Sequence, residues 1–197
     1  GNIYYFNTNN GMLVTKRWII SNRKAYYATK TGAIQTGWYR LNSKQYYADS
    51  TGARVTGLQT INSKTYYFNA AGVVQTSWKT LNGKRYYFAP NFSGTSYGMA
   101  RTGWFNLNNN IYYANADGSL VTGWVLYNNN RYYLDPNNGG AAIRGKTVSI
   151  GGVTYTFDSE GRQTNWVPDG AYSIKVDRQR NMVAIYKGSY LVKVFLC

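Results

Sequence analysis

Residues 37–52 read GWYRLNSKQYYADSTG, and this stretch decides the fold. Two short runs of aromatic and aliphatic residues, 38–41 and 44–48, flank the pair Asn42-Ser43. Asparagine tolerates the positive φ that a two-residue hairpin turn requires. Residues 49–52 then supply the polar and glycine residues of a second turn. The stretch therefore predicts one β-hairpin followed by a turn.

The same pattern recurs along most of the chain. Tyrosine pairs stand at 4–5, 26–27, 46–47, 66–67, 86–87, 112–113 and 132–133. Eight residues before most pairs stands a tryptophan, namely Trp18, Trp38, Trp78, Trp104 and Trp124, and Leu58 takes that place once. A single hairpin is only marginally stable in water, so neighbouring hairpins must stack to bury their rings. We predict an all-β fold, a solenoid of stacked β-hairpin repeats of about 20 residues, with a short extra β segment at the C-terminus.

Strand geometry divides each tyrosine pair. Adjacent residues of a strand face opposite sides, so Tyr46 and Tyr47 cannot both point inward. One ring is expected in the core, and the other is expected to line a groove or face solvent. A row of such rings would form a surface for stacking sugars or binding cations. The alternative is that every ring only builds the core.

Composition limits the classes of function. The net charge of +15 favours polyanionic partners such as teichoic acid, anionic lipid or nucleic acid, although it can also serve solubility alone. The chain has no histidine, and its only cysteine is Cys197. We therefore expect no catalytic residue, no metal site and no cofactor. No apolar run approaches the roughly 20 residues that span a bilayer, so we expect no membrane span.

Nucleic acid is a weaker alternative. Basic charge interleaved with aromatics is typical of single-strand binders. Here, however, the basic residues cluster beside the hairpin turns, as in Arg23-Lys24 and Lys84-Arg85. This regular spacing equally suits an anionic wall polymer, and we expect no nucleic acid partner. The chain starts at Gly1 without a signal peptide, which we interpret as a mature or excised piece of a longer protein.

The quoted pattern resembles the cell-wall-binding repeats of Gram-positive surface proteins, over about residues 1–166. That superfamily includes choline-binding repeats, the glucan-binding repeats of streptococcal glucosyltransferases and the C-terminal repeats of clostridial toxins. The resemblance implies a non-catalytic module that anchors a secreted protein at the cell wall or cell surface. Its implied partners are cell-wall polysaccharide, glucan or teichoic acid. Because an array of repeats has uncapped ends, a homodimer through those ends is a further expectation.

Choline-binding members of this superfamily hold their ligand in an aromatic cage. The cage combines the tryptophan, an aromatic residue just before the tyrosine pair and a tyrosine of the next hairpin. The second position is never aromatic in this chain: it holds Ala25, Gln45, Thr65, Arg85, Ile111 and Arg131. The two arginines would repel a cation, and the Tyr-Tyr-Phe runs at 66–68 and 86–88 are closer to the sugar-recognising types. Choline, glucan and teichoic acid all stay open as ligands.

One repeat carries an insertion, Pro90 to Gly98, which resembles the longer repeat that creates a saccharide pocket in the toxin family. Tyr97, Arg101, Trp104 and Tyr112 are expected to converge on a sugar there; alternatively the insertion, with Phe92, is a lengthened surface loop. The complete set of predicted ligand-binding residues is Trp38, Tyr46, Trp78, Tyr86, Tyr97, Arg101, Trp104, Tyr112, Trp124 and Tyr132.

The repeat pattern stops after Trp166. Alternating apolar runs separated by polar turns then predict a new β element over the last thirty residues. This element is similar to the opening strands of L,D-transpeptidase catalytic domains, but the histidine and the serine-glycine-cysteine-arginine run of that family are absent. We predict repeats over 1–167 and an incomplete start of an L,D-transpeptidase-like domain over 168–197. The alternative function is a fragment of such a peptidoglycan cross-linking enzyme, without its catalytic part.

Overall fold

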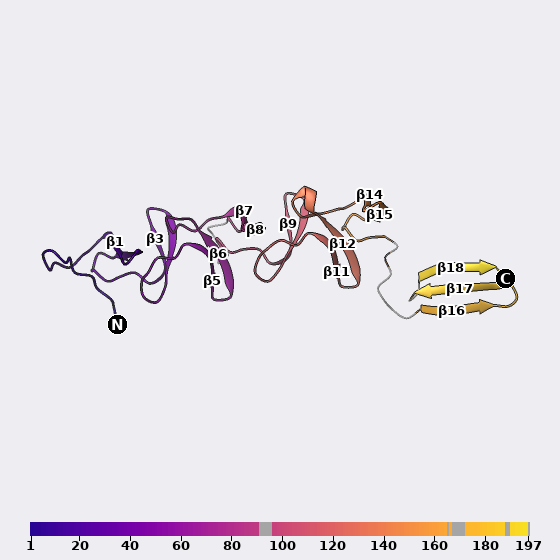
Figure 1. Cartoon of the computed structure of the whole chain (residues 1–197), viewed down its shortest axis with the longest axis horizontal. Coiled ribbons are helices and arrows are strands. Elements are labelled where there is room, and N and C mark those ends of the chain that lie inside the picture. The colour runs from indigo at the N-terminus through magenta and orange to yellow at the C-terminus, as the bar shows by residue number, and fades with distance from the viewer. Residues whose placement is uncertain (91–95, 165, 167–171, 188–189, 197) are drawn as a thin grey trace. The chain divides into compact units, whose positions relative to one another are not determined.

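A computed structural model describes residues 1–90, 96–164, 166, 172–187 and 190–196, and these residues form β-hairpins almost throughout (Figure 1). The prediction of an all-β fold of stacked hairpins is confirmed. The chain divides into two compact units, one of residues 1–103 and 114–119 and the other of residues 104–113 and 120–197. The predicted domain boundary between 167 and 168 lies outside the described residues.

The first unit contains four two-stranded antiparallel hairpins. They are β1 (Arg17–Ser21) with β2 (Lys24–Ala28), β3 (Gly37–Leu41) with β4 (Lys44–Ala48), β5 (Gly57–Ile61) with β6 (Lys64–Phe68), and β7 (Ser77–Leu81) with β8 (Lys84–Phe88).

The second unit contains three more hairpins and a separate small sheet. Its elements are β9 (Gly103–Leu107) with β10 (Asn110–Ala114), β11 (Gly123–Tyr127) with β12 (Asn130–Asp135) and β13 (Ala141–Ala142), the 3-10 helix η1 (Pro136–Asn138), β14 (Lys146–Ile150) with β15 (Val153–Phe157), and the sheet of β16 (Tyr172–Asp177), β17 (Met182–Lys187) and β18 (Tyr190–Leu196). Gly103 and Ala114, at the ends of β9 and β10, are assigned to the first unit.

The predicted turns form as expected from their residue types. Asn42 and Ser43 have φ of 47° and 62°, and Asn128 and Asn129 have φ of 46° and 57°. Two successive positive φ angles define the hairpin turn whose twist matches that of the strands. In the second turn of the repeat, Gly52 has φ of 82°, and a Cβ there would lie 2.3 Å from a side-chain carbon of Ile34. Only glycine fits that position.

Each hairpin has two distinct faces. Trp38 pairs with Tyr47 across β3 and β4, and Tyr39 pairs with Tyr46. Because successive residues alternate, the tryptophan, the second tyrosine and the residue before the tyrosine pair share one face, which we call the tryptophan face. The first tyrosine lies on the opposite face. The Trp38 ring lies 4.8 Å from that of Tyr66 in the next hairpin, so the tryptophan face of one hairpin packs on the opposite face of the next.

Backbone hydrogen bonds fasten non-adjacent segments within the first unit. The segment after one hairpin donates to a backbone carbonyl of the preceding hairpin in the chain. These bonds run from Arg54 N–H to Ala25, from Val74 N–H to Gln45 and from Ala100 N–H to Thr65, over 2.8–2.9 Å. The buried core is correspondingly local. One cluster comprises Ile61, Tyr66, Phe68 and Val74, with Trp38, Tyr47 and Tyr97 among the rings packed against it.

The small sheet β16–β18 differs from the hairpins in its burial. Its strands are antiparallel in the order β16-β17-β18, which confirms the predicted extra β segment (Figure 1). Ile174 and Val176 of β16 are more than half exposed, and Ala184 is the buried apolar residue among its described side chains.

Candidate functional site

One aromatic cluster of the second unit surrounds Trp104. Its ring centroid lies 4.7 Å from that of Tyr132, 4.9 Å from that of Tyr113 and 5.7 Å from that of Tyr127. The planes of these rings are inclined to the indole by 51–67°, so they form walls rather than a flat stack. We call Trp104, Tyr113, Tyr127 and Tyr132 the Trp104 site.

Strand alternation explains how the two hairpins build this site. Trp104 and Tyr113 lie on the tryptophan face of β9–β10. Tyr127 and Tyr132 come from β11 and β12, whose register pairs Val125 with Tyr132 and Tyr127 with Asn130. Tyr127 and Tyr132 therefore share the opposite face of the next hairpin, which meets the Trp104 ring. The site needs both hairpins, because neither carries enough rings alone.

A hollow of about 260 Å³ opens at the Trp104 site, and it is lined by Trp104, Phe105, Asn106, Ile111, Tyr127, Tyr132 and Glu160. Pockets for drug-sized ligands occupy roughly 300–1,000 Å³, so this hollow suits a smaller group. Within the described residues, no lysine or arginine lies over the Trp104 ring. The indole face is accessible to an external group.

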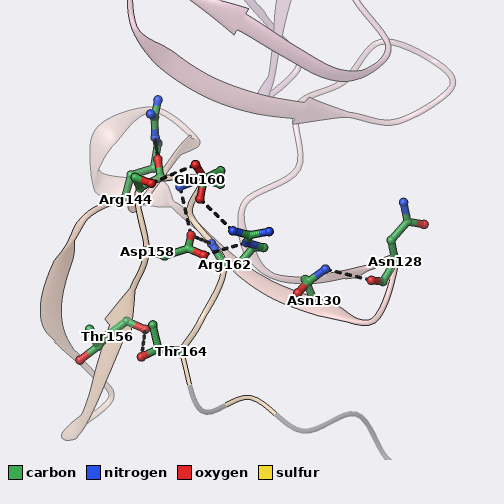
Figure 2. Close-up of polar contacts among 9 residues, drawn as sticks. Asn128, Asn130, Arg144, Thr156, Asp158, Glu160, Arg162 and Thr164 are labelled. Atoms are coloured by element: carbon green, nitrogen blue, oxygen red, sulfur yellow. Dashed lines mark hydrogen bonds and ion pairs between the residues drawn. The ribbon is translucent and has the colours of Figure 1, made fainter.

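Acidic residues lie beside the hollow. Arg162 donates to the Asp158 carboxylate over 2.7 Å and to the Glu160 carboxylate over 2.8 Å (Figure 2). Burial alone would raise the pKa of Asp158, but hydrogen bonds from the Arg162 side chain and backbone hold that pKa below its ordinary value. Burial raises the pKa of the Tyr132 hydroxyl, opposed by the Arg162 charge. Glu160 is the charged residue that lines the hollow, and the Arg144 guanidinium donates to the carbonyl of the neighbouring Ser159.

Two described tryptophan faces outside the second unit carry a cation of the chain itself. The guanidinium of Arg54 lies 5.1 Å from the Trp18 ring, and that of Arg85 lies 4.0 Å from the Trp78 ring. Trp18 also contacts Tyr27 and Tyr39, at 5.4 and 6.4 Å. Burial raises the pKa of Tyr39 to about 12, although the Arg54 charge opposes this rise. The Trp18 cluster thus resembles the Trp104 site in its rings but not in its access.

Among the described residues of the second unit, a closed cluster of this kind lies at Trp124. The Arg131 guanidinium lies 3.7 Å from the Trp124 ring and 4.9 Å from the Trp166 ring. The Trp124 ring in turn contacts Tyr133 at 5.0 Å and Tyr155 at 4.7 Å. These two ring spacings are within 0.1 Å of the corresponding ones at Trp104, 4.9 and 4.7 Å, but an arginine covers the indole.

The predicted site residues divide by burial. Tyr46, Tyr86 and Tyr112 are buried, and Tyr132 is partly buried, because the first tyrosine of each pair faces the neighbouring hairpin. Trp38, Trp78, Trp104 and Trp124 are partly exposed. A ladder of outward rings would therefore draw on the tryptophans and second tyrosines more than on the first tyrosines. The role of each residue in ligand binding stays a prediction.

The insertion is described only in part, because Phe92 lies outside the described residues. Tyr97 packs against the Tyr66 and Phe68 cluster of the first unit, and burial raises the pKa of its hydroxyl. Arg101 of the same unit is exposed. In the second unit, Trp104 contacts Tyr132, whereas Tyr112 stacks on Phe105 at 5.4 Å. Trp104 and Tyr112 thus occupy different faces of one hairpin, and their convergence on a sugar with the insertion stays a prediction.

Sequence reasoning missed Tyr113, Tyr127 and Glu160. Tyr113 was detectable as the second residue of its pair, on the same face as the tryptophan. Tyr127 stands three residues after Trp124, a position that is not aromatic in other repeats, so its spacing carried no signal. Glu160 lies in the turn after β15, at the position that Thr51 holds in the equivalent turn after β4, so its repeat position alone did not mark it as part of the site.

A second, larger hollow of about 960 Å³ adjoins the Trp104 site and shares Asn106 and Ile111 with it. Asn108, Asn109, Asn138 and Lys146 are among its polar lining residues. No group of three His, Cys, Asp or Glu side chains among the described residues is placed to hold a metal ion. The described helical structure includes no segment long and apolar enough to cross a membrane.

Comparison with protein families identifies the hairpins. Residues 55–91 and 101–145 match the family described as the choline-binding repeat, and residues 36–53 match the putative cell wall binding repeat. These hairpins are choline-binding and cell-wall-binding repeats. The choline-binding repeats thus include β9–β12, the hairpins that form the Trp104 site.

Several solved structures are similar to this chain. CbpJ from Streptococcus pneumoniae TIGR4 is 30% identical with a TM-score of 0.69, and the match covers 83% of this chain and 55% of CbpJ. Choline binding protein F from Streptococcus pneumoniae, crystallised in the presence of a peptidoglycan analogue, is 29% identical with a TM-score of 0.69, covering 84% and 55%. The choline-binding domain of CbpL, at 24% identity and a TM-score of 0.59, covers 83% and 82% and shows the fold alone.

The chain thus spans about half the length of the first two structures. A search of curated protein sequences found no match.

Proposed function

We propose that this chain binds choline groups of cell-wall polymers through the Trp104 site. The single observation that carries the proposal is that the Trp104 indole lines a hollow of about 260 Å³ together with Tyr127 and Tyr132, with Tyr113 in contact with the same indole. Aromatic faces attract quaternary ammonium groups, and each ring contributes about 0.5–2 kcal/mol depending on its desolvation. This cluster combines several inclined rings with an adjoining hollow.

Charge supports the same ligand. The net charge of the chain is +15, which disfavours an approaching cation in general. Glu160 lines the hollow and provides one carboxylate toward which a cation can approach. The basic surface elsewhere attracts the phosphates of an anionic wall polymer.

The adjoining hollow of about 960 Å³ provides room for the polymer that carries the choline. Amide side chains such as those of Asn106 and Asn138 both donate and accept hydrogen bonds, as hydroxyl groups of sugars require. A second candidate function, binding of a glucan or other wall polysaccharide without choline, is favoured by this polar hollow alone.

Isothermal titration calorimetry with choline chloride, at constant ionic strength, tests the proposal. The wild-type chain is expected to bind choline saturably and W104L to bind it at least tenfold more weakly. Leu58 already occupies the equivalent place in the β5–β6 hairpin, so leucine is compatible with this fold. V153A, which alters an exposed side chain of β15, is the matched control. Absence of choline binding by the wild type, or equal binding by W104L, would overturn the proposal.

Retention on purified walls separates the two candidates. Release by free choline but not by sodium chloride supports choline recognition. Release by free saccharide but not by choline favours the glucan candidate. Loss of binding to every wall fraction contradicts both.

The remaining parts of the prediction are also proposals. We propose that the chain is non-catalytic and works at the cell surface of a Gram-positive bacterium, with association of two copies through the ends of its array. The β16–β18 sheet supports, by its alternating strands, an L,D-transpeptidase-like start over 168–197. Peptidoglycan cross-linking by this chain alone would contradict the first of these statements.

A further inference from the structure

Arg131 occupies a complete aromatic cluster of the second unit. Its guanidinium lies 3.7 Å from the Trp124 ring, 4.9 Å from the Trp166 ring and 6.0 Å from the Tyr155 ring. Three rings around one cation reproduce the arrangement by which aromatic cages hold organic cations. The cation in this case belongs to the chain.

The position of Arg131 within its hairpin explains this contact. It stands just before the pair Tyr132-Tyr133, and its register partner is Leu126, two residues beyond Trp124. Arg131 therefore lies on the tryptophan face, diagonally across the strands from the indole. Arg85 holds the equivalent position beside Trp78, and its guanidinium lies 4.0 Å from that ring.

The Trp104 hairpin differs at this position. Ile111 stands just before Tyr112-Tyr113 and lines the open hollow beside the indole. The ring geometry is otherwise matched: Trp104 lies 4.7 Å from Tyr132, and Trp124 lies 4.7 Å from Tyr155. One side chain thus accounts for the difference in access between the two clusters.

We infer that Trp124, Tyr155 and Trp166 form a second binding site for an organic cation such as choline, which Arg131 keeps closed, so that the residue before the tyrosine pair selects the hairpins that take ligand. This inference rests on the proposed function for the class of ligand. A tethered guanidinium competes at the effective concentration set by its short side chain, which dissolved choline does not match. An arriving cation would also meet a like charge.

Reciprocal substitutions test the inference. R131I gives the Trp124 hairpin the residue found at Trp104, and I111R gives the Trp104 hairpin the residue found at Trp124. Choline binding is counted by equilibrium dialysis of radiolabelled choline at constant ionic strength, with circular dichroism to verify folding. R131I is expected to bind one additional equivalent of choline per chain, and I111R one fewer. R131K, which retains the charge and the reach, is expected to match the wild type.

A second pair of variants locates the added site and separates the two hypotheses. W124A introduced into R131I is expected to remove the added equivalent. W104L/R131I keeps the new site without the proposed one, so choline binding by this variant, with none by the wild type, would contradict the proposed function and support the inference. A folded R131I with the wild-type stoichiometry would overturn the inference, whatever the wild type binds.

Discussion

The Trp104 and Trp124 clusters have almost the same arrangement of rings, but only the Trp124 indole is covered by an arginine of the chain. Trp104 lies 4.9 Å from Tyr113, and Trp124 lies 5.0 Å from Tyr133. Ile111 leaves the first indole open, whereas Arg131 covers the second. The comparison teaches that a tryptophan–tyrosine repeat does not by itself leave its indole open. Under the proposed function, the neighbour that occupies the indole face decides whether a repeat binds ligand or only contributes to the fold.

The largest expected effect is a loss of folding stability that would disrupt both clusters together. Leu134 of β12 is fully buried in the hairpin that supplies Tyr132 to one cluster and Trp124 to the other. Leu134→Ala is expected to lower the free energy of unfolding by about 2–5 kcal/mol, because a buried leucine leaves a cavity. Urea denaturation measures this loss. Val153→Ala, on an exposed strand residue, is expected to lose less than about 1 kcal/mol.

The next effect concerns ligand affinity. Trp104→Leu is expected to weaken choline binding by about 2 kcal/mol, roughly thirtyfold, as large aromatic anchors do in binding sites. Calorimetric titration gives the dissociation constant. Trp124→Leu removes an indole that Arg131 already covers. Its effect on choline affinity should therefore be much smaller than that of Trp104→Leu. Equal losses at the two positions would contradict the distinction between open and closed clusters.

The Arg131 contact should also contribute to stability. Without choline, Arg131→Ile is expected to lower the free energy of unfolding by about 1 kcal/mol, since a partly desolvated cation–π contact is worth roughly 0.5–2 kcal/mol. Added choline should recover more stability in this variant than in the wild type, because an additional ligand binds only the folded state. Thermal denaturation at several choline concentrations measures both effects. A variant that choline stabilises no more than the wild type would argue against a second cluster.

A smaller effect is expected from Glu160. Glu160→Gln should weaken choline binding only about two- to fivefold, because exposed charges contribute roughly 0.2–1 kcal/mol. The difference between wild type and variant should shrink as salt rises. Titrations at low and high sodium chloride provide the check. A salt-independent difference would indicate a role other than charge.

The smallest effect is the pH dependence near Asp158. Its pKa is lowered in the folded chain, so its contribution to stability is present above the ordinary pKa of about 3.9 and is lost as pH falls through the lowered pKa. We expect stability to decline on acidification in that range. Asp158→Asn should make stability fall less steeply on acidification. Denaturation between pH 2 and pH 6, roughly two pH units on either side of the ordinary pKa, measures this slope. An unchanged slope would show that other carboxylates dominate.

The sequence was sufficient for the hairpins. The pairs Asn42-Ser43 and Asn128-Asn129 fixed the turns because few residues accept two positive φ angles. Strand alternation also separated Tyr46 from Tyr47, since only the pleat is needed for that step. Local geometry thus determined the fold.

The candidate site depended on contacts that no period records. Tyr127 reaches Trp104 from the following hairpin, and Glu160 reaches the hollow from a loop. The arginines at 85 and 131 were expected to repel a cation, but the stacking of their guanidiniums on the indoles was not anticipated. Stacking depends on the side-chain path across the face, which strand alternation does not specify.

The hydrogen bonds from Arg54 to Ala25, from Val74 to Gln45 and from Ala100 to Thr65 have a mechanical consequence. Each bond joins the segment after one hairpin to the preceding hairpin in the chain. A hairpin at the end of the first unit can therefore detach only after the segment bonded to it has been pulled away. Tension applied along the chain should therefore extend this unit in successive steps of one repeat, each releasing roughly 70 Å of chain for 20 residues at full extension. A surface protein with this behaviour would dissipate shear gradually instead of failing in a single event.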